Sequence, residues 1–210
     1  MTSLSRRTEA QTEKRAAVER SVLEATEALL AEGASYAELG IERIATRAGI
    51  SRTAFYFYFR DKRELLMRLT AGIAEELFAE AERWWSGEGE GEPELRAAIA
   101  KIVDIYRRHP ALLRAVVEAA AYDDEAARFW RALVGRFADS TQARIEREQA
   151  AGTVDPALPA QATAFALVWM TERSAYERLV QEDAVGEQPL IEALLRIWLC
   201  AVYGAPQHTG

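Results

Sequence analysis

The residues best suited to chemistry in this sequence lie together in one short segment, ISRTAFYFYFRDKRELL, at positions 50–66. The segment combines a run of aromatic side chains with arginine and lysine on both sides of it. Rings can pack against sugars, hydroxyl and cationic groups can bind phosphates, and arginine can bind guanine through two hydrogen bonds. These residue types indicate a surface for a polyanion. A purely structural aromatic cluster is the alternative, although it would not need the basic residues.

The charge distribution favours the same interpretation. The 210-residue chain has a net charge of −7, which by itself argues against a polyanion partner. Residues 43–68, however, contain seven Arg or Lys against two acidic residues, whereas residues 69–210 contain 14 basic and 23 acidic residues. A basic patch on an acidic protein is typical of a dedicated polyanion-binding head, and a solvated helical face could produce part of the same pattern.

Residues 41–58, IERIATRAGISRTAFYFY, predict two short helices joined by a tight turn. Ala45 is small enough for the second helix to cross the first closely, and Gly49 lies where the chain must reverse with a positive φ. Ser51 can cap the second helix by accepting a backbone hydrogen bond. A DNA-binding helix-turn-helix has this arrangement, and its second helix meets base edges in the major groove. An ordinary helical corner is the alternative, and the basic neighbours favour DNA binding.

A second helix that begins at Ser51 places Phe55 and Phe59 on the same side, where we expect them in the core. The opposite side then faces the DNA. Arg52 is suited to guanine or to a phosphate, and Thr53 offers a hydroxyl and a methyl group to bases. Tyr56 and Phe57 also face the groove. The hydroxyls of Tyr56 and Tyr58 and the ammonium group of Lys62 are expected to bind phosphates.

The rest of the chain predicts an all-α protein. Apolar positions recur at spacings of three and four, and strand signals are nearly absent. The acidic segment SGEGEGEPE, residues 86–94, is expected to be a flexible connection. The nine expected helices cover approximately residues 10–31, 41–48, a short segment after 51, 61–85, 93–109, 110–120, 123 or 124 to 150, 159–182 and 189–203.

Neither membrane insertion nor secretion is indicated. The longest apolar run, AFALVWM at residues 164–170, is far shorter than the roughly 18 residues of a membrane span. The first residues show no secretory signal. The single cysteine, Cys200, fits a reducing compartment and a packing role. We therefore expect a cytoplasmic protein with no membrane partner.

Catalysis is also not indicated. The two histidines, His109 and His208, have no metal-ligand spacing, and the sequence contains no nucleophile motif. Glu172 and Arg173 could form a buried ion pair, but neighbouring opposite charges on a helix are usually structural. We expect no metal, no cofactor and no enzymatic activity.

The segment GIERIATRAGISRTAFYFYFRDKRELL resembles the N-terminal signature of the tetracycline-repressor (TetR) family, and MTERSAY and RIWLCAVYG extend the resemblance to its EthR-like subgroup. The resemblance implies a nine-helix fold with a helix-turn-helix domain at residues 1–62 and a ligand-binding and dimerisation domain at residues 63–210. Glu42 stands where some members have a basic, base-reading residue. The family's DNA-facing positions correspond to Arg43, Arg52, Thr53, Tyr56, Phe57, Tyr58 and Lys62, and Ser51 completes the predicted DNA-binding set.

The later helices carry apolar and aromatic stripes, which form a core more often than a ligand site. The resemblance nevertheless implies that some of these residues line an effector channel. Val168 and Thr171 stand where relatives can present amide side chains, so we expect a more apolar channel in which Thr171 orients the ligand's polar group. The implied ligand-binding residues are Ile102, Tyr106, Trp130, Phe137, Val168, Thr171, Tyr176 and Trp198.

Together these features predict a ligand-responsive, sequence-specific DNA-binding transcriptional regulator. We expect a repressor that is released from a double-stranded DNA operator by a small apolar or amphipathic effector. The last two helices are expected to form a homodimer, because their apolar run is longer than one helix needs for its own core. That run comprises Leu190, Leu194, Leu195, Trp198 and Val202. The alternative is a helical dimeric carrier or scaffold without a DNA-binding role.

Overall fold

The computed structural model describes residues 2–87, 91–180 and 185–204, and in these residues the chain forms nine helices and no strand. This confirms the predicted all-α fold. Among the described residues no helix is both long and apolar enough to cross a membrane. The helices are α1 (Thr2–Ala31), α2 (Ile41–Arg47), α3 (Arg52–Tyr58), α4 (Lys62–Ser86), α5 (Glu92–Arg108), α6 (Pro110–Tyr122), α7 (Asp124–Ala151), α8 (Ala160–Leu179) and α9 (Glu187–Tyr203).

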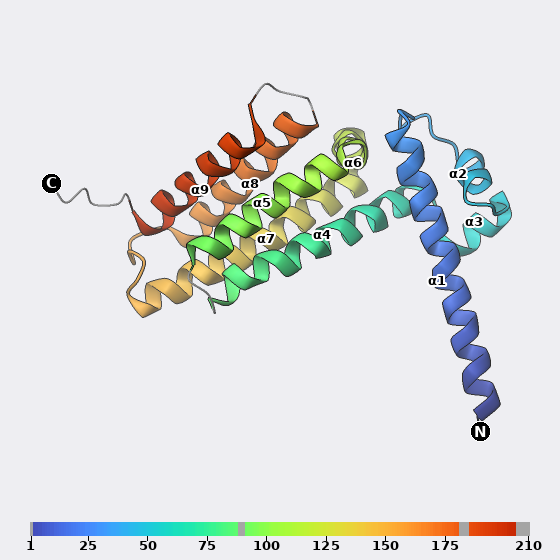
Figure 1. Ribbon diagram of the computed structural model, residues 1–210, viewed down its shortest axis with the longest axis horizontal. Helices are drawn as coiled ribbons and strands as arrows, with labels where there is room; N and C mark the ends of the chain where they lie inside the picture. The colour runs from blue at the N-terminus through green and yellow to red at the C-terminus, as the bar shows by residue number, and fades with distance from the viewer. Residues whose placement is uncertain (1, 88–90, 181–184, 205–210) are drawn as a thin grey trace.

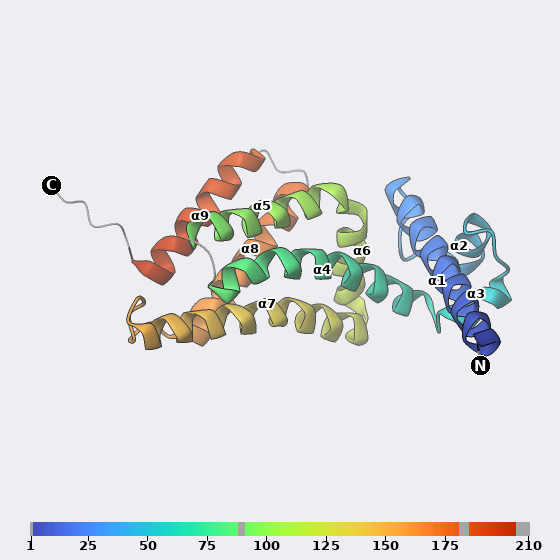
Figure 2. The same ribbon diagram turned by 60° about the horizontal axis from the view of Figure 1, so that its bottom comes forward.

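The helices form a small head and a longer body (Figure 1). The head consists of α1, α2 and α3, and α4 runs from the head along the length of the body. Figure 2 shows α4 between α7 on one side and α5 on the other, with α9 against the outer side of α5. The central position of α4 makes it the covalent and mechanical link between the two parts.

The helix starts and stops follow the predicted local chemistry. The Ser51 side chain accepts a hydrogen bond from the backbone N–H of Ala54 at 3.1 Å, and the Asp61 side chain accepts one from Glu64 N–H at 2.7 Å. The Glu64 carboxylate reaches back to Arg60 N–H at 2.8 Å, one residue before the helix cap. Gly49 has a φ of +71°, so the turn between α2 and α3 uses the conformation expected of it.

Some helix boundaries differ from the predicted ones. α1 begins at Thr2 rather than near Ala10. The first residues are mostly good helix formers without Gly or Pro, so nothing stops the helix there. α9 begins at Glu187, with Pro189 inside its first turn, where no intrahelical N–H bond is lost. The predicted end of the preceding helix near residue 182 and part of the 86–94 connection lie outside the described residues.

Two large apolar clusters fill the molecule. The head cluster contains Ile44, Phe55 and Phe59, and it extends to Leu112 and Val116 of α6. The head is therefore attached to the body through apolar packing on α6 as well as through α4. The body cluster is built from α4, α5, α7, α8 and α9, and includes Trp84, Ile99, Ile145, Leu194 and Trp198.

Candidate nucleic-acid interface and ligand cavity

Helix α3 separates its aromatic residues into a buried side and an exposed side. Phe55 and Phe59 are fully buried in the head cluster, as predicted. Tyr56 and Phe57 are 47% and 71% exposed. Arg52 and Thr53 are also exposed on the first turn of α3. An exposed phenylalanine and tyrosine on one turn form an unusual free surface, and large exposed apolar groups often mark binding sites.

The turn before α3 is held firmly by the rest of the head. Ile44 and Ala45 of α2 are buried, and Ile50 N–H donates to the carbonyl of Ala45 at 3.0 Å. The Ser21 hydroxyl of α1 donates to the carbonyl of Ala48 at 3.1 Å. These contacts fix the orientation of α3 relative to α1 and α2, as a helix that reads a groove requires.

Much of the predicted basic charge of the head is neutralised by ion pairs within the chain. Arg63 lies 3.0 Å from an Asp123 carboxylate oxygen, and Arg60 lies 3.0 Å from Glu125. Arg47 pairs with Glu32 and Arg68 with Glu64. Counting charges along residues 43–68 therefore overestimated the free positive charge, because several of the partners come from helices distant in sequence. Within the described part of the chain, Arg43 and Arg52 are exposed and make no ion pair.

Lys62, a predicted phosphate contact, is engaged inside the protein. Its ammonium group donates to the carbonyls of Tyr36 at 2.7 Å and Ala37 at 3.0 Å, and lies 4.6 Å from the centre of the Tyr36 ring. Burial lowers the pKa of Lys62. One ammonium proton is left for another partner, so its role on DNA stays a prediction.

Arg15 of α1 belongs to the exposed aromatic surface, although sequence reasoning did not select it. Its guanidinium lies 5.8 Å from the ring centre of Phe57 and 6.0 Å from that of Tyr58. It also pairs with Glu19 at 3.0 Å. No local pattern relates Arg15 to α3, because the packing of α1 across the head brings them together.

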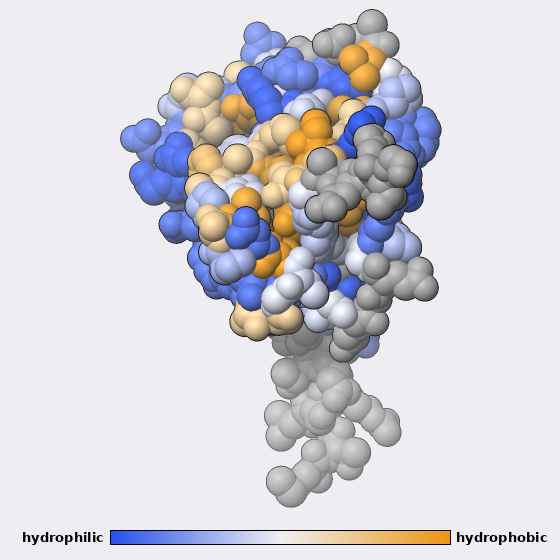
Figure 3. All heavy atoms as spheres, turned by 90° about the vertical axis from the view of Figure 1, so that its left-hand side faces the viewer, coloured by the Kyte–Doolittle hydropathy of each residue, from blue (hydrophilic) through white to orange (hydrophobic). Residues whose placement is uncertain are grey.

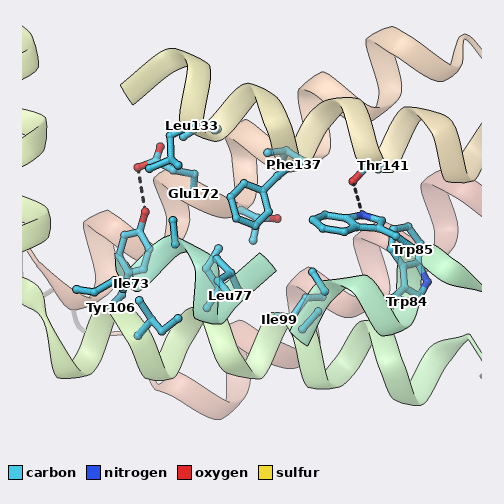
Figure 4. Close-up of a pocket in the computed structure, with 18 of the residues that line it drawn as sticks. Ile73, Leu77, Trp84, Trp85, Ile99, Tyr106, Leu133, Phe137, Thr141 and Glu172 are labelled. Atoms are coloured by element: carbon cyan, nitrogen blue, oxygen red, sulfur yellow. Dashed lines mark hydrogen bonds between the residues drawn. The ribbon is translucent and has the colours of Figure 1, made fainter. Parts of the chain in front are cut away.

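The body contains an apolar cavity of about 110 Å³ between α4, α5, α7 and α8, with one residue each from α6 and α9. Figure 4 shows Phe137 and Leu77 pointing into its middle, with Trp84 and Trp85 at one end and Tyr106 and Glu172 at the other. Seven of the eight predicted ligand-binding residues line this cavity: Ile102, Tyr106, Trp130, Phe137, Val168, Thr171 and Trp198.

Tyr176, the eighth predicted residue, does not line the cavity. It is buried among Ile105, Leu113 and Val180. It lies one helical turn beyond Glu172 on α8, past the end of the cavity. Apolar side chains surround it, so its predicted contact with a ligand stays a prediction.

Helix α4 supplies a wall of the cavity that sequence reasoning missed. Its contributions include Thr70, Ile73, Leu77, Trp84 and Trp85. Their spacing in the sequence is that of any helix packed on a core, so no local signal separated them from ordinary packing residues. The same helix that begins at the head thus touches the cavity over most of its length.

The threonine hydroxyls around the cavity are already bonded. Thr171 donates to the carbonyl of Leu167 at 2.8 Å and accepts from the indole N–H of Trp198 at 2.8 Å. Thr141 accepts from the indole N–H of Trp85 at 3.2 Å. The Thr171 hydroxyl, expected to orient a ligand, has its single proton committed to α8 and can offer only its remaining lone pair.

The missed polar group of the cavity is Glu172. Its side chain is buried, and the Tyr106 hydroxyl donates to its Oε1 at 3.3 Å. Burial raises the pKa of Glu172. The suggested ion pair with Arg173 is not formed, because Arg173 pairs with Glu177 at 3.0 Å on the outer side of the helix. Adjacent residues on a helix point about 100° apart, so sequence adjacency did not bring the two charges together.

Two family models match separate parts of the chain. Residues 22–69 match the model of the bacterial regulatory proteins of the tetR family, and residues 95–204 match the C-terminal domain of the transcriptional regulator EthR. The HTH-type transcriptional regulator EthR of Mycolicibacterium smegmatis is 31% identical over 186 residues, which cover 86% of this chain and 84% of that protein. The chain belongs to the TetR family, in its EthR-like subgroup. Like its relatives, it is a helix-turn-helix transcriptional regulator.

Other TetR-family comparisons agree with this assignment. EthR of Mycobacterium tuberculosis is 31% identical over 193 residues, covering 89% of this chain and 87% of that protein. SmeT, the repressor of the Stenotrophomonas maltophilia multidrug efflux pump SmeDEF, has a TM-score of 0.71 at 19% identity, covering 88% of this chain and 89% of that one. FadR from Bacillus subtilis in complex with stearoyl-CoA has a TM-score of 0.69 at 15% identity, covering 89% and 99%. The last two show the shared fold.

Proposed function

We propose that this regulator is a repressor that leaves a double-stranded DNA operator when a small apolar or amphipathic molecule enters the body cavity. The observation that carries the proposal is the course of α4. Its first turns, with Leu65 and Leu66, belong to the head cluster, and its later turns, from Thr70 to Trp85, line the cavity. A ligand that displaces α4 therefore changes the position of the head.

The head also contacts the body through polar groups that such a movement would disturb. Arg60, in the turn between α3 and α4, donates to Glu125 of α7 at 3.0 Å. His109, between α5 and α6, pairs with Glu27 of α1. Typical coupling free energies of about 1 to 3 kcal/mol would lower operator affinity about 5- to 150-fold.

We assign DNA binding to residues 1–62, and ligand binding and dimerisation to residues 63–210. Arg43 and Arg52 are the principal contacts to DNA, because acidic side chains of the described chain pair with the other arginines of residues 43–68. Arg15 joins the contacts through its position beside the exposed ring of Phe57. The full proposed set is Arg15, Arg43, Ser51, Arg52, Thr53, Tyr56, Phe57, Tyr58 and Lys62.

A homodimer through α8 and α9 is part of the proposal, but for a different reason than the sequence suggested. Leu194, Leu195, Trp198 and Val202 are buried in the subunit's own core. The free apolar residues are instead Phe165, Ile197 and Tyr203, which are 59%, 44% and 39% exposed. Figure 3 shows apolar side chains gathered on the end of the body that lies at the left in Figure 1, with hydrophilic side chains around them. A two-fold dimer would cover part of this surface and present two heads to two half-sites.

Structural relatives support an apolar effector. One solved structure of the same fold is a SmeT–triclosan complex, with a TM-score of 0.73 at 20% identity, and the FadR relative holds stearoyl-CoA. The cavity here is lined mainly by aliphatic and aromatic side chains, which bury a ligand without offering it many hydrogen bonds. Membership in a family of transcriptional regulators favours binding over catalysis.

The test begins with duplex fragments selected from genomic DNA by the purified protein. Apolar compounds that raise the melting temperature are then titrated against the preformed DNA complex, and Phe137→Ala serves as a variant with an altered cavity. We expect these compounds to release the wild-type protein from DNA and to lose this effect on Phe137→Ala. Compounds that bind without releasing DNA would contradict effector control, and the absence of salt-sensitive duplex binding would favour the carrier or scaffold.

A further inference from the structure

The cavity has one charged group in an otherwise neutral lining. Of the described lining residues, Glu172 alone carries a formal charge, and its side chain is buried. The hydroxyls of Thr70 and Thr171 donate to backbone carbonyls of their own helices, and the Thr141 hydroxyl is paired with Trp85. The carboxyl group of Glu172 is therefore the principal polar feature available to a ligand.

No cation of the described chain forms an ion pair with Glu172, although the positive charge of Arg173 acts on it from a distance. The one hydrogen bond of Glu172 comes from the Tyr106 hydroxyl to Oε1, and Oε2 accepts none from the described residues. The neighbouring guanidinium of Arg173 lies 3.0 Å from Glu177 and 5.1 Å from the centre of the Tyr176 ring, away from the cavity. A carboxylate can accept about four hydrogen bonds, so most of its capacity is unused.

A carboxyl group with few partners is unfavourable in apolar surroundings. Taking a carboxylate out of water costs several kcal/mol unless a cation or hydrogen-bond donors replace the water. The Tyr106 hydroxyl supplies one donor at the long end of the hydrogen-bond range. A ligand that brings a positively charged donor would complete the site, whereas a ligand carboxylate would be repelled.

We propose that Glu172 makes the cavity selective for amphiphiles that carry a primary or secondary amine, bound as the ammonium ion beside Glu172 and Tyr106. This inference rests on the proposed function, because the same cavity would receive the effector. Figure 4 shows the geometry: Glu172 and Tyr106 meet at one end, and the apolar side chains of Phe137, Leu77 and Trp85 follow toward the other. An aromatic or alkyl body attached to the amine would occupy that apolar length.

The direct test compares ligands that differ only in their polar end. Phenylbutylamine, phenylbutanol and phenylbutyrate carry the same phenyl ring on a short alkyl chain. Each is titrated into the purified wild-type protein at neutral pH, and binding is measured by calorimetry. The ammonium ion loses water on entry, which reduces the gain from the ion pair. We still expect the amine to bind at least about tenfold more tightly than the alcohol, and the carboxylate to bind most weakly.

Glu172→Gln identifies the group responsible. The amide keeps the size of the side chain and can still accept from Tyr106, while its negative charge is removed. We expect the variant to lose the preference for the amine and to bind the alcohol within about threefold of the wild type. Glu146→Gln is the matched control, because it makes the same change at an exposed carboxylate of α7 that does not line the cavity, and the amine preference should persist in it.

Two results would overturn the inference: equal binding of amine and alcohol by the wild type, or an amine preference that survives Glu172→Gln. Because the first comparison uses only the wild type, it decides the question even if a variant folds poorly. The same ligands are then added to the preformed DNA complex. Release by the alcohol without an amine preference refutes this inference alone, whereas a Glu172-dependent amine preference without release refutes effector control alone.

Discussion

Replacing Arg52 by alanine should weaken operator binding strongly, whereas replacing Arg63 should not. Both residues belong to the basic stretch that sequence analysis interpreted as one DNA-binding surface. Arg52 is exposed on the first turn of α3 and makes no ion pair among the described residues. Arg63 lies 3.0 Å from Asp123 and 3.1 Å from Glu125, so its charge is already used. Comparing the two variants shows whether DNA binding depends on arginines without an ion pair or on every arginine of the basic stretch.

The expected magnitude follows from removing one base-reading arginine in each half-site. Such an arginine contributes about 1 to 3 kcal/mol, so a dimer that engages two half-sites would bind about 2 to 6 kcal/mol more weakly. This corresponds to about a 30-fold to 10⁴-fold decrease in affinity. The Arg63 side chain is 32% exposed and its Asp123 partner 28%, and solvent screens such a pair, so Arg63→Ala should remain folded.

The assay is fluorescence anisotropy of a selected operator duplex, measured over a range of salt concentrations for the wild type and both variants. Arg52→Ala should bind more weakly and discriminate less at one position of each half-site. If Arg52 binds phosphate instead, the slope of log affinity against log salt should fall by about 0.9 for each phosphate that the variant no longer neutralises. Arg63→Ala should keep the wild-type slope and bind within about threefold.

The reasoning would be refuted if Arg63→Ala weakened binding as much as Arg52→Ala and reduced the salt slope as well. That result would show that the ion pairs of Arg63 with Asp123 and Glu125 open on DNA. An Arg52→Ala variant that bound like the wild type would instead refute the assignment of α3 as the reading helix. Circular dichroism of both variants provides the control for folding.

Three further outcomes follow from the body. Thr171→Val leaves the buried indole N–H of Trp198 without its acceptor and should lower the free energy of unfolding by about 1 to 3 kcal/mol in chemical denaturation; an unchanged value would show that water or another group replaces it. The raised pKa of Glu172 means that the folded state disfavours its ionisation. The protonated carboxyl group of Glu172 therefore stabilises the folded state fully below the ordinary carboxyl pKa, and this stabilisation is lost as pH rises through the raised pKa. The free energy of unfolding of Glu172→Gln should therefore increase relative to that of the wild type between acidic and neutral pH. A difference in unfolding free energy between the two proteins that does not change with pH would contradict this prediction. Phe165→Glu should weaken dimer formation at least tenfold in sedimentation experiments, and an unaffected dimer would place the interface elsewhere.

The sequence alone was sufficient for the local features of the fold. The caps at Ser51 and Asp61 and the positive φ of Gly49 depend on residues within a few positions, so residue type and spacing predict them. The same holds for the division of α3 into a buried and an exposed side, since helical periodicity places Phe55 and Phe59 together. The family resemblance, and not the spacing of residues in the sequence, predicted seven of the residues that line the cavity.

Only the tertiary structure decided which charges are free and which polar groups face the cavity. The partners of Arg60 and Arg63 come from α7 and the residue before it, some 60 positions away, and no local pattern predicts such pairs. The Thr171 hydroxyl is engaged because Trp198 of α9 packs beside it. Glu172 faces the cavity without a cation because α8 turns Arg173 outward toward Glu177. In each case the free energy of a charged or polar group depends on groups brought close by packing, and neighbours in sequence do not determine that packing.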